Sequence, residues 1–166
     1  MTPEDPIVQA YLARSRVARI ATRSEKGWPA LAPLWFVAHE GRLYTTTGAA
    51  TLAARNAAAH PAVSVLLDAE ADGPRAAHVL RLHGRARVRA GLPSWRILLE
   101  MARKYYLAPG ALRSEWAHAS QWDLRRRYYA QSEGVTIEIT PERAELLVRP
   151  RLDPGVSVAC RATARS

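Results

Sequence analysis

The chain has 166 residues, of which 48% are hydrophobic and 23% are charged, and this ordinary globular composition excludes a disordered or collagen-like protein. The apolar stretches are too short to cross a bilayer, and residues 1–16 lack the apolar segment of a secretory signal. We therefore expect a cytoplasmic protein without a membrane partner, with a single domain over residues 1–150 and a disordered tail over 151–166. The net charge is +9, and residues 81–127 hold most of the excess, with 11 basic and 3 acidic side chains.

Three strands are predicted near the start of the chain. Residues 17–22 form a short strand, and the polar turn 24–27 separates it from residues 29–38. The second segment is apolar on both faces, which predicts a strand that is covered on both sides. A further turn at 39–41 leads to a strand over 43–47. We expect these three strands to form an antiparallel meander.

A helix and two strands follow. Residues 49–60 are rich in alanine, which predicts a short helix that ends before Pro61. Residues 62–68 predict the next strand. The alternation is clearest over 78–90, where apolar residues face one way and four arginines and a histidine face the other.

A helical pair and a hairpin are predicted for the last part of the domain. Apolar residues at helical spacing predict a helix over 93–108 and a second one over 112–132. Residues 135–140 and 144–148 alternate on either side of a turn at Pro141, which predicts a closing hairpin. About six strands with this helix arrangement indicate an antiparallel β-barrel. A parallel dinucleotide-binding sheet is disfavoured because the sequence has no Gly-x-Gly-x-x-Gly.

The chemistry-bearing residues favour an anion site over a metal or hydrolytic site. The histidines form no metal-ligand pattern, and no Gly-x-Ser-x-Gly turn is present. The strand that ends in Thr45–Thr47 runs through Gly48 into the helix that carries Thr51 and Arg55. Such a helix start offers free N–H groups, a positive dipole and hydroxyl groups, which suit a phosphate. An ordinary capped helix is the alternative.

Four stretches, in this order and spacing, resemble the FMN-binding split-barrel superfamily that includes pyridoxamine 5'-phosphate oxidase. They are VARIAT with GWPALAPLWFV, RLYTTTG, TLAARNAAAHPAVSVLL and HVLRLHGRARV. The helical pair and the ending VTIEITPERAELL resemble the subgroup of flavin or deazaflavin (F-420) oxidoreductases. The resemblance implies a mainly β (α+β) fold, an antiparallel split β-barrel of about six strands with a short helix and a helical pair.

The resemblance also implies a homodimer with two cofactor sites between the protomers. The cofactor would be FMN, with F-420 as the alternative and haem as a weaker one. Leu34, Trp35 and Phe36 would lie along the isoalloxazine ring, while Thr46 and Thr47 would face the ribityl chain and phosphate. An ordinary core position is the alternative for Trp35.

One segment departs from the family pattern. Where relatives have a Ser-Arg-Lys-like stretch, this chain has Thr51, Leu52 and Ala53, so the usual cationic phosphate grip is missing. Arg55 lies four residues after Thr51 on the same helical face and could supply the charge. Arg81 or Arg85 of the basic strand is the other candidate.

Several functions remain open from the sequence. The first is a flavin- or F-420-dependent oxidoreductase that transfers hydride on a small conjugated substrate, with the chemistry supplied by the cofactor. The second is a barrel that holds flavin or haem without turnover, for which a histidine such as His83 in the dimer cleft would be the mark. Pyridoxamine 5'-phosphate oxidase activity is disfavoured because residues 149–166 do not match that enzyme's ending. Nucleic-acid binding through residues 125–129, three arginines followed by two tyrosines, is also disfavoured, since a solvated helix face explains them.

Overall fold

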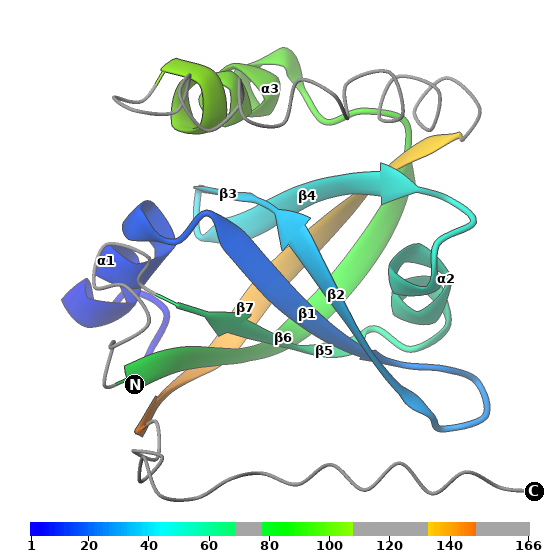
Figure 1. Cartoon of the computed structure of the whole chain (residues 1–166), viewed down its shortest axis with the longest axis horizontal. Coiled ribbons are helices and arrows are strands. Elements are labelled where there is room, and N and C mark those ends of the chain that lie inside the picture. The colour runs from blue at the N-terminus through cyan, green and yellow to red at the C-terminus, as the bar shows by residue number, and fades with distance from the viewer. Residues whose placement is uncertain (69–77, 108–132, 149–166) are drawn as a thin grey trace, which may run out of the picture.

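A seven-stranded antiparallel sheet, curled into a half-barrel, forms the centre of the protein (Figure 1). The computed structural model describes residues 1–68, 78–107 and 133–148. The strands are β1 (Val17–Arg23), β2 (Pro29–Trp35), β3 (Val37–His39), β4 (Arg42–Gly48), β5 (Ala62–Leu67), β6 (His78–Ala90) and β7 (Gly134–Val148). Their order in the sheet is β2-β1-β5-β6-β7-β4-β3. The predicted fold class, a mainly antiparallel split-barrel α+β fold, is confirmed.

β2 and β3 are neighbours in the chain but lie at opposite edges of the sheet. β2 pairs with β1, β3 pairs with β4, and Phe36 alone joins β2 to β3. The two edges must therefore meet at Phe36, which rolls the sheet into a barrel (Figure 1). The predicted three-strand meander is wrong, because the segment 29–38 divides into two strands at this residue.

The outward face of β2 is open in the single chain. The prediction of a strand covered on both sides is wrong here, since Leu31 is 57% exposed and Trp35 is 37% exposed. The strand alternates between exposed and partly buried positions, which is the pattern of an edge strand with one face on the core.

β7 runs straight through Pro141, so the predicted hairpin at this residue is wrong. β7 pairs with β6 along its length, with a shift of register between His83 and Gly84. Pro141 is paired with Gly84 at this β-bulge, a position that tolerates the missing N–H of proline. Glycine is required opposite it, because a Cβ on Gly84 would lie 2.3 Å from the carbonyl oxygen of Thr140.

The inside of the barrel is the hydrophobic core. The predicted alternation of β6 is confirmed, since Leu80, Leu82 and Ala86 are buried while Arg85 and Arg87 are exposed. The largest fully buried side chains come from five strands and the β2–β3 junction: Ile20, Phe36, Leu43, Leu67, Leu80, Leu82, Ile137 and Ile139. Burial of each such side chain contributes roughly 1.5–3 kcal/mol to stability. Side chains thus fill the barrel, as expected for a small one.

The first helix was not among the predicted elements. α1 (Pro6–Arg14) begins after Asp5, whose carboxylate accepts a hydrogen bond of 2.9 Å from the N–H of Ile7. Pro6 occupies the first helical position, where proline is favoured. An Asp-Pro pair is a sequence signal for a helix start, so this element was within reach of the sequence.

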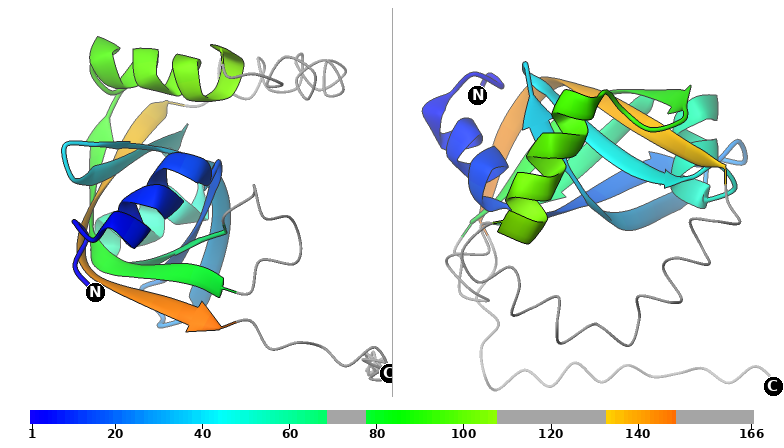
Figure 2. Two further views of the ribbon diagram at one scale, coloured as in Figure 1. Left: turned by 90° about the vertical axis from the view of Figure 1, so that its left-hand side faces the viewer. Right: turned by 90° about the horizontal axis from the view of Figure 1, so that it is seen from above.

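Two further helices lie outside the barrel. α2 (Leu52–Ala59) confirms the predicted alanine-rich helix. α3 (Trp95–Ala102) continues into the π-helix η2 (Arg103–Leu107) and lies above β3 and β4 (Figures 1 and 2). Among the described residues, no helix is long and apolar enough to cross a membrane. The predicted helix over 112–132, which includes the arginine run, and the predicted tail over 151–166 lie outside the described residues.

Candidate functional site

An apolar cleft of about 520 Å³ opens between the edge strand β2, the strand β4 and the helical segment α3–η2. Its lining residues are Pro33, Leu34, Trp35, Thr46, Leu98, Met101, Ala102, Tyr105 and Tyr106. The volume lies within the range of small-molecule sites, which are mostly apolar with few polar groups. None of these lining side chains is charged, so the cleft suits an uncharged, apolar group.

Aromatic rings form one wall of the cleft. The Trp35 indole stacks on the Tyr105 ring, with 4.5 Å between centroids and 6° between planes. The Tyr106 ring meets the same indole edge-on at 6.2 Å and 74°. Aromatic rings attract one another in both arrangements. A wall of rings such as this one suits a flat conjugated ligand.

The helical segment presents two apolar lines. Ile97 and Tyr105 are buried and pack with Val37 beneath the helix. The second line begins at Trp95, which is 68% exposed. Three further residues on this side of the segment line the cleft: Leu98, Ala102 and Tyr106.

Threonines lead from the cleft to the start of α2. Thr46 lines the cleft, and the Thr47 hydroxyl lies 3.3 Å from the Thr51 hydroxyl. Thr51 caps α2: its oxygen accepts from the N–H of Ala54 at 3.3 Å, and its hydroxyl donates to the carbonyl of Gly48 at 2.8 Å. The helix α2 is therefore capped by Thr51, and the hydroxyl groups of Thr47 and Thr51 lie beside its N-terminus.

The start of α2 holds no cation at the positions where the family pattern places them. Leu52 is 62% exposed, while Ala53 is buried against the barrel. Arg55 is exposed one turn later, on the same side of the helix as Leu52. The geometry therefore leaves Arg55 as the cation of this helix that could reach a phosphate at its N-terminus.

Two other predicted residues lie apart from the cleft. The Phe36 side chain is 1% exposed in the core, with the Lys104 ammonium 3.9 Å from its ring centroid. Any contact from Phe36 to a ligand in the cleft would therefore involve its backbone. Arg81 lies on β6 and is engaged by Glu145 of β7.

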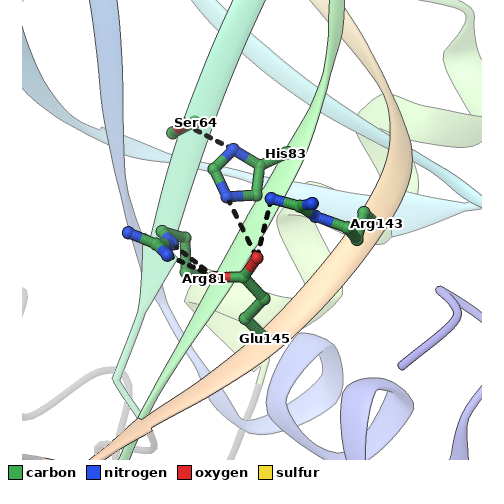
Figure 3. A network of polar contacts seen from close by, with 5 residues as sticks. All are labelled: Ser64, Arg81, His83, Arg143 and Glu145. Atoms are coloured by element: carbon green, nitrogen blue, oxygen red, sulfur yellow. Dashed lines mark hydrogen bonds and ion pairs between the residues drawn. The ribbon is translucent and has the colours of Figure 1, made fainter.

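Glu145 is the centre of a polar network on β5, β6 and β7 (Figure 3). Its carboxylate accepts a hydrogen bond of 3.1 Å from Arg81 Nε and forms an ion pair with Arg143 Nη2 at 2.7 Å. His83 Nε2 lies 3.8 Å from the same carboxylate, and His83 Nδ1 lies 3.1 Å from Ser64 Oγ. The Arg81 hydrogen bond lowers the pKa of Glu145, and the charges of Arg143, Arg81 and His83 act in the same direction against the effect of burial.

Two of the candidate residues belong to this network, and their roles in cofactor binding stay predictions. Arg81 balances the charge of Glu145 rather than facing the aromatic cleft. His83 lines a second cavity of about 370 Å³ together with Ser64, His60 and Arg23. Neither residue is among those that line the aromatic cleft.

The curled antiparallel sheet, closed at Phe36 and flanked by a cleft at its edge, defines a protein of the pyridoxamine 5'-phosphate oxidase-like split-barrel class. The family model described as pyridoxamine 5'-phosphate oxidase matches residues 5–148. The chain belongs to this family. The resemblance stated from the sequence is thereby confirmed.

Solved structures with the same fold include proteins that handle different cofactors. An F420 reductase is 19% identical, with a TM-score of 0.56 over 82% of this chain and 94% of that one. The haem-storage protein HutZ from Vibrio cholerae is 16% identical, with a TM-score of 0.58 and coverage of 89% and 95%. An FAD-binding protein from Mesorhizobium loti is 21% identical, with a TM-score of 0.53 and coverage of 88% and 95%. No curated protein matches the chain.

Proposed function

We propose that the protein is an oxidoreductase that binds FMN or the deazaflavin F-420 and transfers hydride to or from a small conjugated substrate. The aromatic cleft carries this proposal, because its stacked Trp35–Tyr105 wall and uncharged lining suit a flat ring system. When bound, the cofactor supplies the hydride chemistry. The chain orients the ring against Trp35 and excludes water with Leu98 and Met101. The likeness to an F420 reductase and an FAD-binding protein supports the same class of ligand.

The residues present also fit the rest of such a cofactor. Thr46 offers a hydroxyl at the cleft, and Thr47 and Thr51 follow toward the N-terminus of α2. The first N–H groups of a helix and its dipole attract a phosphate. Arg55 is the cation that we assign to this end of the cofactor, since Arg81 is engaged by Glu145.

We propose further that the protein acts as a homodimer in the cytoplasm. The outward face of β2 exposes Leu31 and Trp35, and Leu52 of α2 is also exposed. Apolar side chains gathered on an edge strand favour contact with a partner. Because Trp35 belongs both to this face and to the cleft, a second copy seated on β2 would cover the open side of the cofactor site.

Titration of the purified protein with FMN and with F-420 tests the first proposal. We expect quenching of FMN fluorescence or a shift of the F-420 absorbance as the ring enters the cleft. Trp35→Ala should weaken binding by about ten- to a hundredfold, because the ring loses its stacking surface. Trp28→Ala is the matched control, since Trp28 is 72% exposed on the turn before β2. If the wild type binds neither FMN nor F-420, the proposal is overturned.

Arg55→Ala tests the phosphate end of the site. A charge-assisted hydrogen bond contributes about 1.5–3 kcal/mol, so we expect FMN to bind about ten- to a hundredfold more weakly. Riboflavin lacks the phosphate and should bind the variant and the wild type equally. Arg87→Ala, an exposed arginine on β6, serves as the charge-matched control. Equal affinity of Arg55→Ala and wild type for FMN would refute the assignment.

A barrel that holds a cofactor without turnover is the second candidate. The observation that favours it is the cleft lining itself, which includes no carboxylate, histidine or charged side chain among the described residues. The likeness to a haem-storage protein extends this candidate to haem. A bound flavin that neither accepts electrons from a nicotinamide donor nor passes them to conjugated carbonyl acceptors would support it, as would a haemin Soret shift at stoichiometric concentration.

A further inference from the structure

We propose that Tyr105 is a positioning residue of the aromatic cleft. Its hydroxyl group holds the junction between β2 and β3, and its ring sets the plane of Trp35. Tyr105 therefore acts on the cofactor through Trp35. This inference rests on the proposed function, because it assigns a role within the proposed cofactor site.

The junction needs a partner that the sheet does not provide. Phe36 lies between the last residue of β2 and the first of β3, and it belongs to neither strand ladder. The residue is 1% exposed, so water does not satisfy its backbone groups. A buried backbone N–H or C=O without a partner is strongly unfavourable.

The Tyr105 hydroxyl is that partner. It accepts a hydrogen bond of 2.8 Å from the N–H of Phe36. Its own proton faces two carbonyl oxygens, that of Arg16 at 2.5 Å and that of Phe36 at 2.7 Å. Since Arg16 directly precedes β1, one hydroxyl group connects the start of β1, the end of β2 and the start of β3.

The same residue also fixes the ring next to this junction. Trp35 directly precedes Phe36 in the chain, and its indole lies nearly parallel to the Tyr105 ring, with 4.5 Å between centroids. Tyr105 is 4% exposed, so its ring cannot adopt another position without moving the helix. The backbone and the indole of β2 are thus both held by one side chain.

A second anchor allows this role to be tested without unfolding the segment. Lys104 donates a hydrogen bond of 3.1 Å to the carbonyl of Leu12, and its ammonium lies over the Phe36 ring. These contacts do not depend on the Tyr105 hydroxyl. Tyr105→Phe should therefore keep η2 in place, while it removes the hydrogen bonds at the junction.

The first readout requires no cofactor. We expect hydrogen exchange at the Phe36 amide to be at least about tenfold faster in Tyr105→Phe than in the wild type, because its acceptor is lost. Tyr106→Phe is the matched control, since Tyr106 is 45% exposed and its ring meets the same indole. Unchanged exchange in Tyr105→Phe would overturn the anchoring of the junction, whether or not the protein binds a cofactor.

The second readout is a double-mutant cycle of cofactor binding. If Tyr105 acts through Trp35, Tyr105→Phe should weaken FMN or F-420 binding by about tenfold in the wild type. The same change should have no further effect in the Trp35→Ala background. Effects that simply multiply, or an unchanged affinity in Tyr105→Phe alone, would overturn the positioning role.

Failure of the two proposals can be told apart. If the wild type binds neither cofactor, the proposed function falls, and the positioning of Trp35 is judged from the near-ultraviolet circular dichroism of the Trp35–Tyr105 pair. We expect Tyr105→Phe to change this signal and Tyr106→Phe to leave it nearly unchanged. The same spectrum in Tyr105→Phe and wild type would overturn the proposal in that case.

Discussion

Replacement of Gly84 by alanine tests the geometry of the β-bulge between the paired strands β6 and β7. The new Cβ would lie 2.3 Å from the carbonyl oxygen of Thr140 and 3.0 Å from Cα of Pro141. Both are backbone atoms, so no side chain can rotate away, and the two strands must separate locally. Overpacking of this kind destabilises a protein by about 1–3 kcal/mol. We expect a value near the upper end, about 3 kcal/mol, which lowers the Tm by about 6–12 °C in a chain of this length.

Gly134→Ala is the matched control for this prediction. Gly134 lies on β7, and a Cβ at this position would meet nothing within 4 Å. Because glycine weakens a strand, we expect the control variant to be stabilised by up to about 1 kcal/mol. Thermal unfolding followed by circular dichroism, with urea unfolding as a second measure, distinguishes the two variants. A Tm of Gly84→Ala within about 1 °C of wild type would refute the argument from close approach.

Two further predictions concern charge and assembly. The pKa of Glu145 is lowered in the folded protein from its ordinary value of 4.5. Its carboxylate therefore stabilises the fold above pH 4.5. This contribution is lost as the pH falls through the lower pKa of the folded protein. Acid unfolding curves should therefore show a smaller loss of stability below pH 4.5 for Glu145→Gln than for wild type, with Glu142→Gln as the control; identical curves would contradict the role of Arg81. Leu31→Asp places a charge on the outward face of β2 and should convert a dimer into a monomer in light scattering, whereas Ile7→Asp on α1 should not. A dimeric Leu31→Asp variant would exclude that face as the interface.

Local alternation made most of the strands predictable, and long-range pairing explains the errors. The bounds of β6 follow from its strict alternation of apolar and polar residues. Pro141 favours a turn when only its neighbours in the sequence are considered. It lies within a continuous strand because β6 presents Gly84 opposite it, and the two residues are 57 positions apart in the chain. The division at Phe36 is hidden for the same reason, since nothing in residues 29–38 indicates that the two halves pair at opposite edges.

The cleft was predicted in part. The motif on β2 and β4 led to Leu34, Trp35 and Thr46, which line it, although their role in cofactor binding stays a prediction. Tyr105 was missed because the helix carries apolar residues on adjacent lines, and periodicity alone does not decide which line faces the core. The Tyr-Tyr pair at the end of that helix was the available signal. The ion pair between Arg81 and Glu145 was not predicted, because it depends on the register of β6 with β7.

The position of β7 has a consequence for how the protein is made. β7 is the last strand of the sheet in the chain, yet it lies between β6 and β4 and pairs with both. Before it leaves the ribosome, the strands already synthesised form two separate groups, β2-β1-β5-β6 and β4-β3, linked through Phe36. The facing edges of β6 and β4 stay unpaired until residues 134–148 insert between them. During synthesis the nascent chain therefore exposes two open sheet edges, which is the condition under which chaperones bind and strands pair with the wrong partner.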